Sequence, residues 1–130
     1  MPVSAYEILA AAGLVSVVIA LGYILAGAPK TGSATLAAAL AAGFGAFTAV
    51  TIAREGVLLV WTNHTENLWG VQVWWDLLFA VGIAVFLIAP RARAAGMNLW
   101  PWLLFVAATA SIGLLAMVAR LFWLEARTEA

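Results

Sequence analysis

Four ionisable side chains lie at or near the ends of long apolar runs in this 130-residue sequence: Glu7, Arg54, Asp76 and Arg120. Asp76 is the most unusual of them, because it is the one charged residue between Val71 and Ala89. A charge in the hydrocarbon of a membrane costs about 3 kcal/mol, so such groups turn inward and pair with an opposite charge. We therefore predict that Asp76 is a buried counter-ion for Arg120 or Arg54.

Small residues at helical spacing precede both arginines. The two stripes are Thr109, Gly113, Ala116 and Arg120, and Ala39, Gly43, Ala46, Val50 and Arg54. Small residues mark the faces on which membrane helices pack closely. The spacing thus predicts that both arginines emerge from packed helix faces, where Asp76 can meet them.

This polar cluster has two interpretations. In the first, it is a structural clamp that fixes helix register, with the arginine side chains extending to the membrane interface. In the second, it is the polar floor of an outward-facing pocket for a small or lipidic ligand. Trp74 and Trp75 also have two possible roles. Tryptophans gather at membrane interfaces as anchors, and the alternative role for these two is stacking against a ligand.

The single histidine lies in a polar stretch with Asn63, His64 and Glu66. One histidine and one nearby carboxylate do not make a metal site without further ligands. We interpret these residues as loop surface, with a metal, haem or proton-transfer role as the alternative. The sequence has no cysteine, which excludes thiolate metal sites and dithiol redox chemistry. No catalytic residue, cofactor or metal is predicted, and an enzymatic activity is neither assigned nor excluded.

The elements that position these residues follow from composition. The sequence is 66% hydrophobic and 9% charged, which is too much apolar surface for a soluble domain of this size to bury. Four apolar runs are long enough to cross about 30 Å of hydrocarbon as helices. The prediction is an all-α polytopic membrane protein, a single domain over residues 1–130 with four transmembrane helices in a bundle at about 6–26, 34–55, 71–90 and 99–125.

The connections indicate a topology. Ser33 and Asn98 are suited to cap the helices that follow them. Lys30, Arg91 and Arg93 lie in the first and third loops, whereas Arg127 is the clear extramembrane basic residue on the opposite side. The positive-inside rule then predicts a multi-pass protein of the inner membrane with both termini outside the cytoplasm.

The segment from Trp75 onward contains Asp76 near a helix start, a basic loop with Arg91, Arg93 and Gly96, the pair Leu99-Trp100, and Phe122-Trp123 followed by Glu125. In these features it resembles a family of small bacterial membrane proteins of unknown function. The resemblance covers about helices two to four. It implies a multi-helix membrane protein, and the family has no known activity to transfer.

The sequence favours a small non-catalytic inner-membrane protein that acts as an accessory subunit or binds a hydrophobic small ligand near the outer face. The alternative is a membrane enzyme or transporter that acts on a hydrophobic or lipidic molecule. A cavity lined by Asp76, Arg120 and Trp75 would favour the alternative, and a tightly packed bundle would favour the accessory role. The expected partners are the lipid bilayer and a homo-oligomer or a larger membrane complex. Zero net charge gives no indication of nucleic acid binding.

Overall fold

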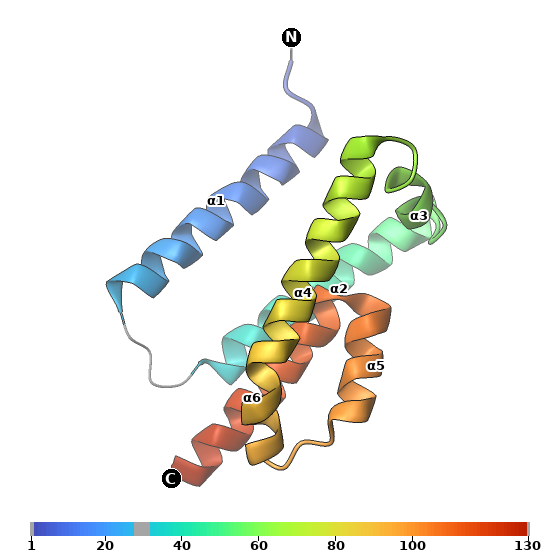
Figure 1. Cartoon of the computed structure of the whole chain (residues 1–130). Helices are drawn as coiled ribbons and strands as arrows, with labels where there is room; N and C mark the ends of the chain where they lie inside the picture. Colours follow the sequence, from blue (N-terminus) through green and yellow to red (C-terminus); the bar gives the residue numbers. More distant parts are fainter. Residues whose placement is uncertain (1, 28–31, 130) are drawn as a thin grey trace. The chain divides into compact units, whose positions relative to one another are not determined.

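A computed structural model describes residues 2–27 and 32–129 as an all-α protein (Figure 1). Its helices are α1 (Ala5–Ala26), α2 (Ala34–Glu55), α3 (Leu59–Asn63), α4 (Leu68–Ala94), α5 (Leu99–Thr109) and α6 (Ser111–Glu129). Three of them, α1, α2 and α4, are long and apolar enough to cross a membrane. The chain divides into two compact units, Met1–Gly32 and Ser33–Ala130, and each is described by itself.

The first unit consists of α1 and its cap. Ser4 accepts a hydrogen bond from the Glu7 amide at 3.1 Å, and the Glu7 carboxylate accepts one from the Ser4 amide at 2.7 Å. This reciprocal arrangement satisfies two amide groups that the first turn of a helix leaves without a partner. The 22 residues that follow span about 33 Å and carry no Lys or Arg.

In the second unit, α2 packs along α6. The Ser33 hydroxyl caps α2 by accepting from the Leu36 amide at 3.1 Å, as the sequence predicted. The partly or fully buried residues of α2 are small and recur at helical spacing: Ala34, Ala37, Ala41, Gly45, Thr48 and Thr51. The predicted stripe through Ala39 and Gly43 is exposed instead. Alanine and glycine occupy several faces of this helix, so their spacing did not identify the packed one.

A tight connection joins α2 to α4 through the short helix α3. Asn67 caps α4 by accepting from the Gly70 amide at 2.8 Å. A Cβ added at Gly70 would lie 2.6 Å from the Asn63 carbonyl oxygen. Gly70 is therefore required for the close approach of the α3 end to the first turn of α4.

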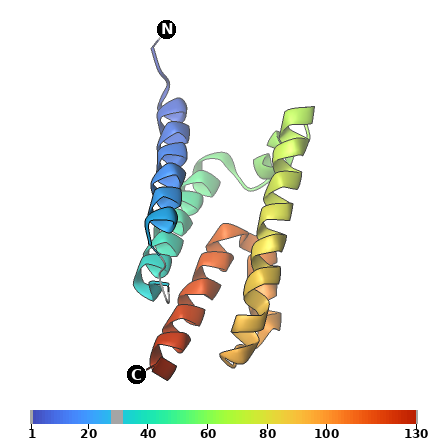
Figure 2. The ribbon, with the colours of Figure 1, turned by 60° about the vertical axis from the view of Figure 1, so that its left-hand side comes forward.

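The stretch predicted as one helix over residues 99–125 is instead two helices that fold back on each other. They meet at Ala110, which has φ 52° and ψ −112°. Figures 1 and 2 show α5 and α6 running in opposite directions, with their junction beside the middle of α4. A Cβ added at Gly113 would lie 2.7 Å from the Phe105 carbonyl oxygen, so glycine permits the close contact of the two helices. We call α5 and α6 together the α5–α6 hairpin.

The core of the second unit lies where the hairpin meets the second half of α4. Its buried residues are Ala92, Met97, Val106, Met117 and Leu121, packed against partly buried residues such as Val85, Ile88 and Trp102. Most other large apolar side chains of α2 and α4 are exposed. A surface of this kind suits a lipid environment.

Candidate functional site

The charged residue that the sequence singled out lies on an exposed face of α4. Asp76 and Gln72 are both exposed and lie one helical turn apart, so their side chains are neighbours. The residues that continue this face at helical spacing are exposed as well, and we call the set the Asp76 face: Gln72, Val73, Asp76, Phe79, Ala80 and Ile83. The opposite side of α4 carries the partly buried positions Trp74, Leu77, Val81 and Val85.

The predicted ion pair between Asp76 and Arg120 is absent from the part of the chain that the structure describes. The one salt bridge recorded there joins Arg91 to Glu125. Arg91 lies fifteen residues, about 22 Å, beyond Asp76 on α4. Arg120 lies five residues, about 7 Å, before Glu125 on α6, which runs in the same direction as α4 (Figure 1). Arg120 is thus about 15 Å further along α4 than Asp76.

The physical reason is the break at Ala110. A single helix over residues 99–125 would carry Arg120 to the end at which α4 begins. The hairpin returns the chain, so Arg120 lies toward the end at which α4 finishes, with its guanidinium 4.5 Å from the centre of the Trp123 ring. Arg127 lies 4.6 Å from the same ring. Cation–π contacts of this kind stabilise exposed arginines by about 0.5 to 1 kcal/mol.

The other two members of the predicted cluster, Arg54 and Glu7, lie in separate local environments. Arg54 lies in the last turn of α2 and is exposed, a position in which a positive charge is favoured by the helix dipole. Glu7 belongs to the capping box of α1. The structure gives Glu7 this local role within the first unit.

The two predicted tryptophans of α4 have different surroundings. Trp74 is partly buried, and its ring lies 6.1 Å from that of Trp61 and 5.4 Å from that of His64. Trp75 is exposed and lies 5.4 Å from Phe79. Trp74 therefore anchors α3 to α4 by aromatic packing, whereas Trp75 borders the Asp76 face. A cavity lined jointly by Asp76, Arg120 and Trp75 would have favoured the enzyme or transporter alternative, and the separation of about 15 Å between Asp76 and Arg120 along α4 does not support it.

The loop residues Asn63, His64 and Glu66 lie at the α3–α4 connection. The His64 Nδ1 atom donates to the Val60 carbonyl oxygen. Glu66 is exposed. Among residues 2–27 and 32–129, no group of three or more His, Cys, Asp or Glu side chains is close enough to hold a metal ion.

The Arg91–Glu125 pair is a connection that sequence reasoning missed. The guanidinium donates to both carboxylate oxygens, from Nε at 2.9 Å and from Nη2 at 2.7 Å. This two-point geometry joins the last turn of α4 to the C-terminal part of α6. Their separation of 34 residues gives no local signal, and the pair follows only once the hairpin is known.

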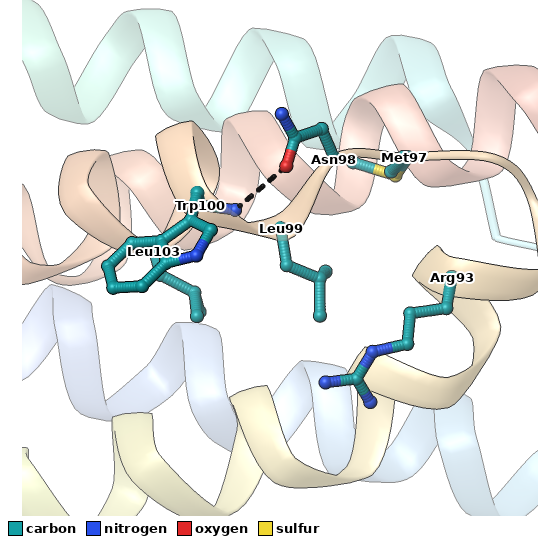
Figure 3. A pocket seen from close by; sticks show the side chains of 6 residues that line it. All are labelled: Arg93, Met97, Asn98, Leu99, Trp100 and Leu103. Atoms are coloured by element: carbon teal, nitrogen blue, oxygen red, sulfur yellow. Dashed lines mark hydrogen bonds between the residues drawn. The ribbon is translucent and has the colours of Figure 1, made fainter.

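An open groove of about 450 Å³ lies at the α4–α5 connection, lined by Arg93, Met97, Asn98, Leu99, Trp100 and Leu103. Figure 3 shows the Arg93 guanidinium and the Leu99 side chain extending toward the same open space. The Asn98 side chain accepts from the Trp100 amide at 3.4 Å, the cap that the sequence predicted. The groove therefore combines one cation with apolar and aromatic side chains.

These features define an all-α protein with three helices suited to cross a membrane and one hairpin of shorter helices. Comparison of the chain with protein-family models, with curated proteins and with solved structures finds no match. The resemblance to small bacterial membrane proteins stays a prediction.

Proposed function

We propose that the chain is a non-catalytic integral membrane subunit that recognises a partner helix through the Asp76 face. The proposal has two parts, a topology and a recognition group. In the topology, α1, α2 and α4 cross the membrane, and the α5–α6 hairpin enters and leaves from one side. This replaces the fourth crossing that the sequence suggested.

The depth of the hairpin supports this topology. A Cβ added at Gly45 would lie 3.9 Å from the Ile112 side chain, and Gly45 is at the middle of α2. The hairpin junction, two residues before Ile112, is therefore level with the middle of a helix that can span the bilayer. The 11 residues of α5 cover about 16 Å, roughly half the hydrocarbon thickness.

Backbone hydrogen bonding at the junction is consistent with a position inside hydrocarbon. The Thr109 hydroxyl donates to the Phe105 carbonyl oxygen at 2.8 Å and accepts from the Gly113 amide at 2.8 Å. The Ala110 amide donates to the Val106 carbonyl oxygen at 2.7 Å. Non-helical backbone at membrane depth requires such internal partners, because lipid tails provide none.

The distribution of charge then orients the chain. Arg91 and Arg93 lie at the end of α4, and Arg120 and Arg127 lie on the part of α6 that returns to the same end. Arg54 lies at the opposite end, where α2 finishes. The positive-inside rule favours the arginine-rich end as cytoplasmic. The start of α1 is then outside and the end of α6 is inside, in contrast to the sequence prediction of both termini outside.

The recognition group is Asp76, and its exposure is the observation that carries the functional proposal. An unpaired carboxylate on a spanning helix costs about 3 kcal/mol, a cost that pairing with a cation offsets. The crossing helix α1 has no Lys or Arg, and Arg120 lies about 15 Å too far along α4. Arg54 forms no salt bridge among the described residues. The structure therefore favours a cation from outside the chain, on a membrane helix that carries Lys or Arg at the depth of Asp76.

Site-specific photo-crosslinking in the native membrane tests this proposal. A photoreactive residue at Ala80, on the Asp76 face, should give a discrete adduct, whereas one at Val85, on the packed side of α4, should not. The adduct should persist in Asp76→Glu and disappear in Asp76→Asn, because recognition needs the charge. An adduct that is insensitive to Asp76→Asn, or no adduct at all, would contradict the proposal. An adduct of twice the chain's mass would indicate self-association in place of an accessory role.

A further inference from the structure

We infer that the groove at the α4–α5 connection binds the headgroup phosphate of an anionic phospholipid. We call it the Arg93 groove, and its lining residues are those shown in Figure 3. The groove does not include any residue of the Asp76 face. The inference therefore stands independently of the recognition proposed for that face.

Arg93 supplies the cation. It lies in the last turn of α4 and is exposed. Its neighbour Arg91 is held by Glu125, whereas Arg93 forms no salt bridge with any of the described residues. Figure 3 shows its guanidinium extending from α4 toward the open space below α5. Guanidinium groups are well suited to phosphate, because their planar N–H donors match its oxygen atoms.

The remaining lining residues fit a lipid better than a free anion. Met97, Leu99 and Leu103 are apolar, and no carboxylate lines the groove. Trp100 is 74% exposed at the start of α5, where an indole at the headgroup level is expected. A phosphate at Arg93 would place the attached acyl chains beside Leu99 and Leu103, on apolar surface that free phosphate would leave uncovered.

The charge of the groove selects the lipid class. With one guanidinium in the lining and no acidic group, the groove complements a single negative headgroup such as that of phosphatidylglycerol. Basic pockets at the cytoplasmic ends of membrane helices bind anionic headgroups. The assignment to the cytoplasmic leaflet rests on the proposed topology, but the affinity for an anionic headgroup does not.

Native mass spectrometry of the full chain, released from micelles with phosphatidylglycerol or phosphatidylcholine, tests the inference. The wild-type chain should retain phosphatidylglycerol in preference to phosphatidylcholine. Arg93→Gln should lower the affinity for phosphatidylglycerol about tenfold, because it removes a charge-assisted hydrogen bond. Arg127→Gln is the matched control, since it removes an arginine at the same end but outside the groove, and it should leave retention unchanged.

A second variant separates the groove from general electrostatics. Leu103→Trp keeps Arg93 and fills the apolar part of the groove, so it should also lower retention of phosphatidylglycerol. Unchanged retention in Arg93→Gln would overturn the inference, as would an equal loss in Arg127→Gln. Complete displacement of the lipid by millimolar inorganic phosphate would also overturn it, because the groove would then be a site for free anions.

Discussion

The Thr109 hydroxyl accepts a hydrogen bond from the Gly113 amide at 2.8 Å and donates one to the Phe105 carbonyl oxygen at 2.8 Å. One side chain thus satisfies a donor of α6 and an acceptor of α5. The contact lies beside Ala110, where the chain reverses direction with a positive φ. The proposed topology depends on this junction, and three features of it can be tested separately.

The first prediction concerns the hydroxyl of Thr109. Thr109→Val keeps the shape of the side chain but leaves the Gly113 amide without its partner. We expect the free energy of unfolding in detergent to fall by about 1 to 2 kcal/mol. Thr109→Ser keeps the hydroxyl and should lose less than half of that amount. Tryptophan fluorescence during denaturation measures these free energies. Equal losses in the two variants would show that the hydrogen bonds contribute little.

The second prediction concerns two substitutions that should change the free energy of unfolding in opposite directions. Ala110→Gly should raise the free energy of unfolding by about 1 kcal/mol, because glycine adopts a positive φ without strain. The same change at Ala108, exposed inside α5, should lower it by about 1 kcal/mol. If residues 99–125 formed one continuous helix, both substitutions would be destabilising.

Gly113→Ala completes that comparison. Its new Cβ would lie within 2.7 to 2.8 Å of the Phe105 backbone, so we expect a loss of about 1 to 3 kcal/mol. Gly82 also lies inside a helix, but its surroundings are open. Gly82→Ala should therefore be neutral or stabilising by up to about 1 kcal/mol. A stabilising effect of Gly113→Ala would contradict the close approach of the two helices.

The third prediction concerns the Arg91–Glu125 pair. The two side chains are 50% and 21% exposed, so solvent screens their attraction. A double-mutant cycle with Arg91→Ala and Glu125→Ala should give a coupling of about 0.5 to 1 kcal/mol, which falls as salt is added. The matching cycle with Arg93→Ala in place of Arg91→Ala should give no measurable coupling.

The fourth prediction distinguishes the proposed topology from four crossings. The chain has no cysteine, so single cysteines at Thr65, Ala94 and Thr128 report on three sites without interference. In intact cells, an impermeant thiol reagent should label the cysteine at Thr65 and leave those at Ala94 and Thr128 unlabelled. Labelling of both Thr128→Cys and Thr65→Cys would contradict the proposed topology and support four membrane crossings.

The fifth prediction concerns Asp76 in the isolated chain. As a counter-ion for one of the chain's own arginines, Asp76 would contribute about 3 to 5 kcal/mol if the pair were fully buried. Its exposure leads us to expect that Asp76→Ala changes the free energy of unfolding in detergent by less than about 0.5 kcal/mol. A loss of several kcal/mol would instead support the interpretation of Asp76 as part of a structural clamp.

The three long apolar helices and two of the helix caps could be predicted from the sequence because the signals are local. Apolar runs, with Asp76 as the one charged residue inside the run of α4, fix α1, α2 and α4 to within a few residues. Ser33 and Asn98 each cap the helix that follows them. These features depend on hydrogen bonds and hydropathy over a few neighbouring residues, which the sequence displays directly.

The break at Ala110 could not be predicted in the same way. Neither glycine nor proline occurs between Trp102 and Gly113 to interrupt the helix, and the apolar character continues on both sides. The weak signal was the polar or small run Thr109-Ala110-Ser111 before Gly113. The predicted Asp76–Arg120 pair depended on one continuous helix from residue 99 to residue 125, and the structure has two helices there.

In the proposed topology, the α5–α6 hairpin reaches only the middle of the bilayer. It therefore gives the second unit unequal cross-sections in the two leaflets. In the proposed topology, α2, α4, α5 and α6 occupy the cytoplasmic half of the bilayer, whereas α2 and α4 occupy the outer half. Each helix with its side chains is about 10 Å wide, so this unit displaces more lipid from the inner leaflet than from the outer one. A wedge of this form favours membrane regions in which the cytoplasmic leaflet is convex, and the chain should accumulate there.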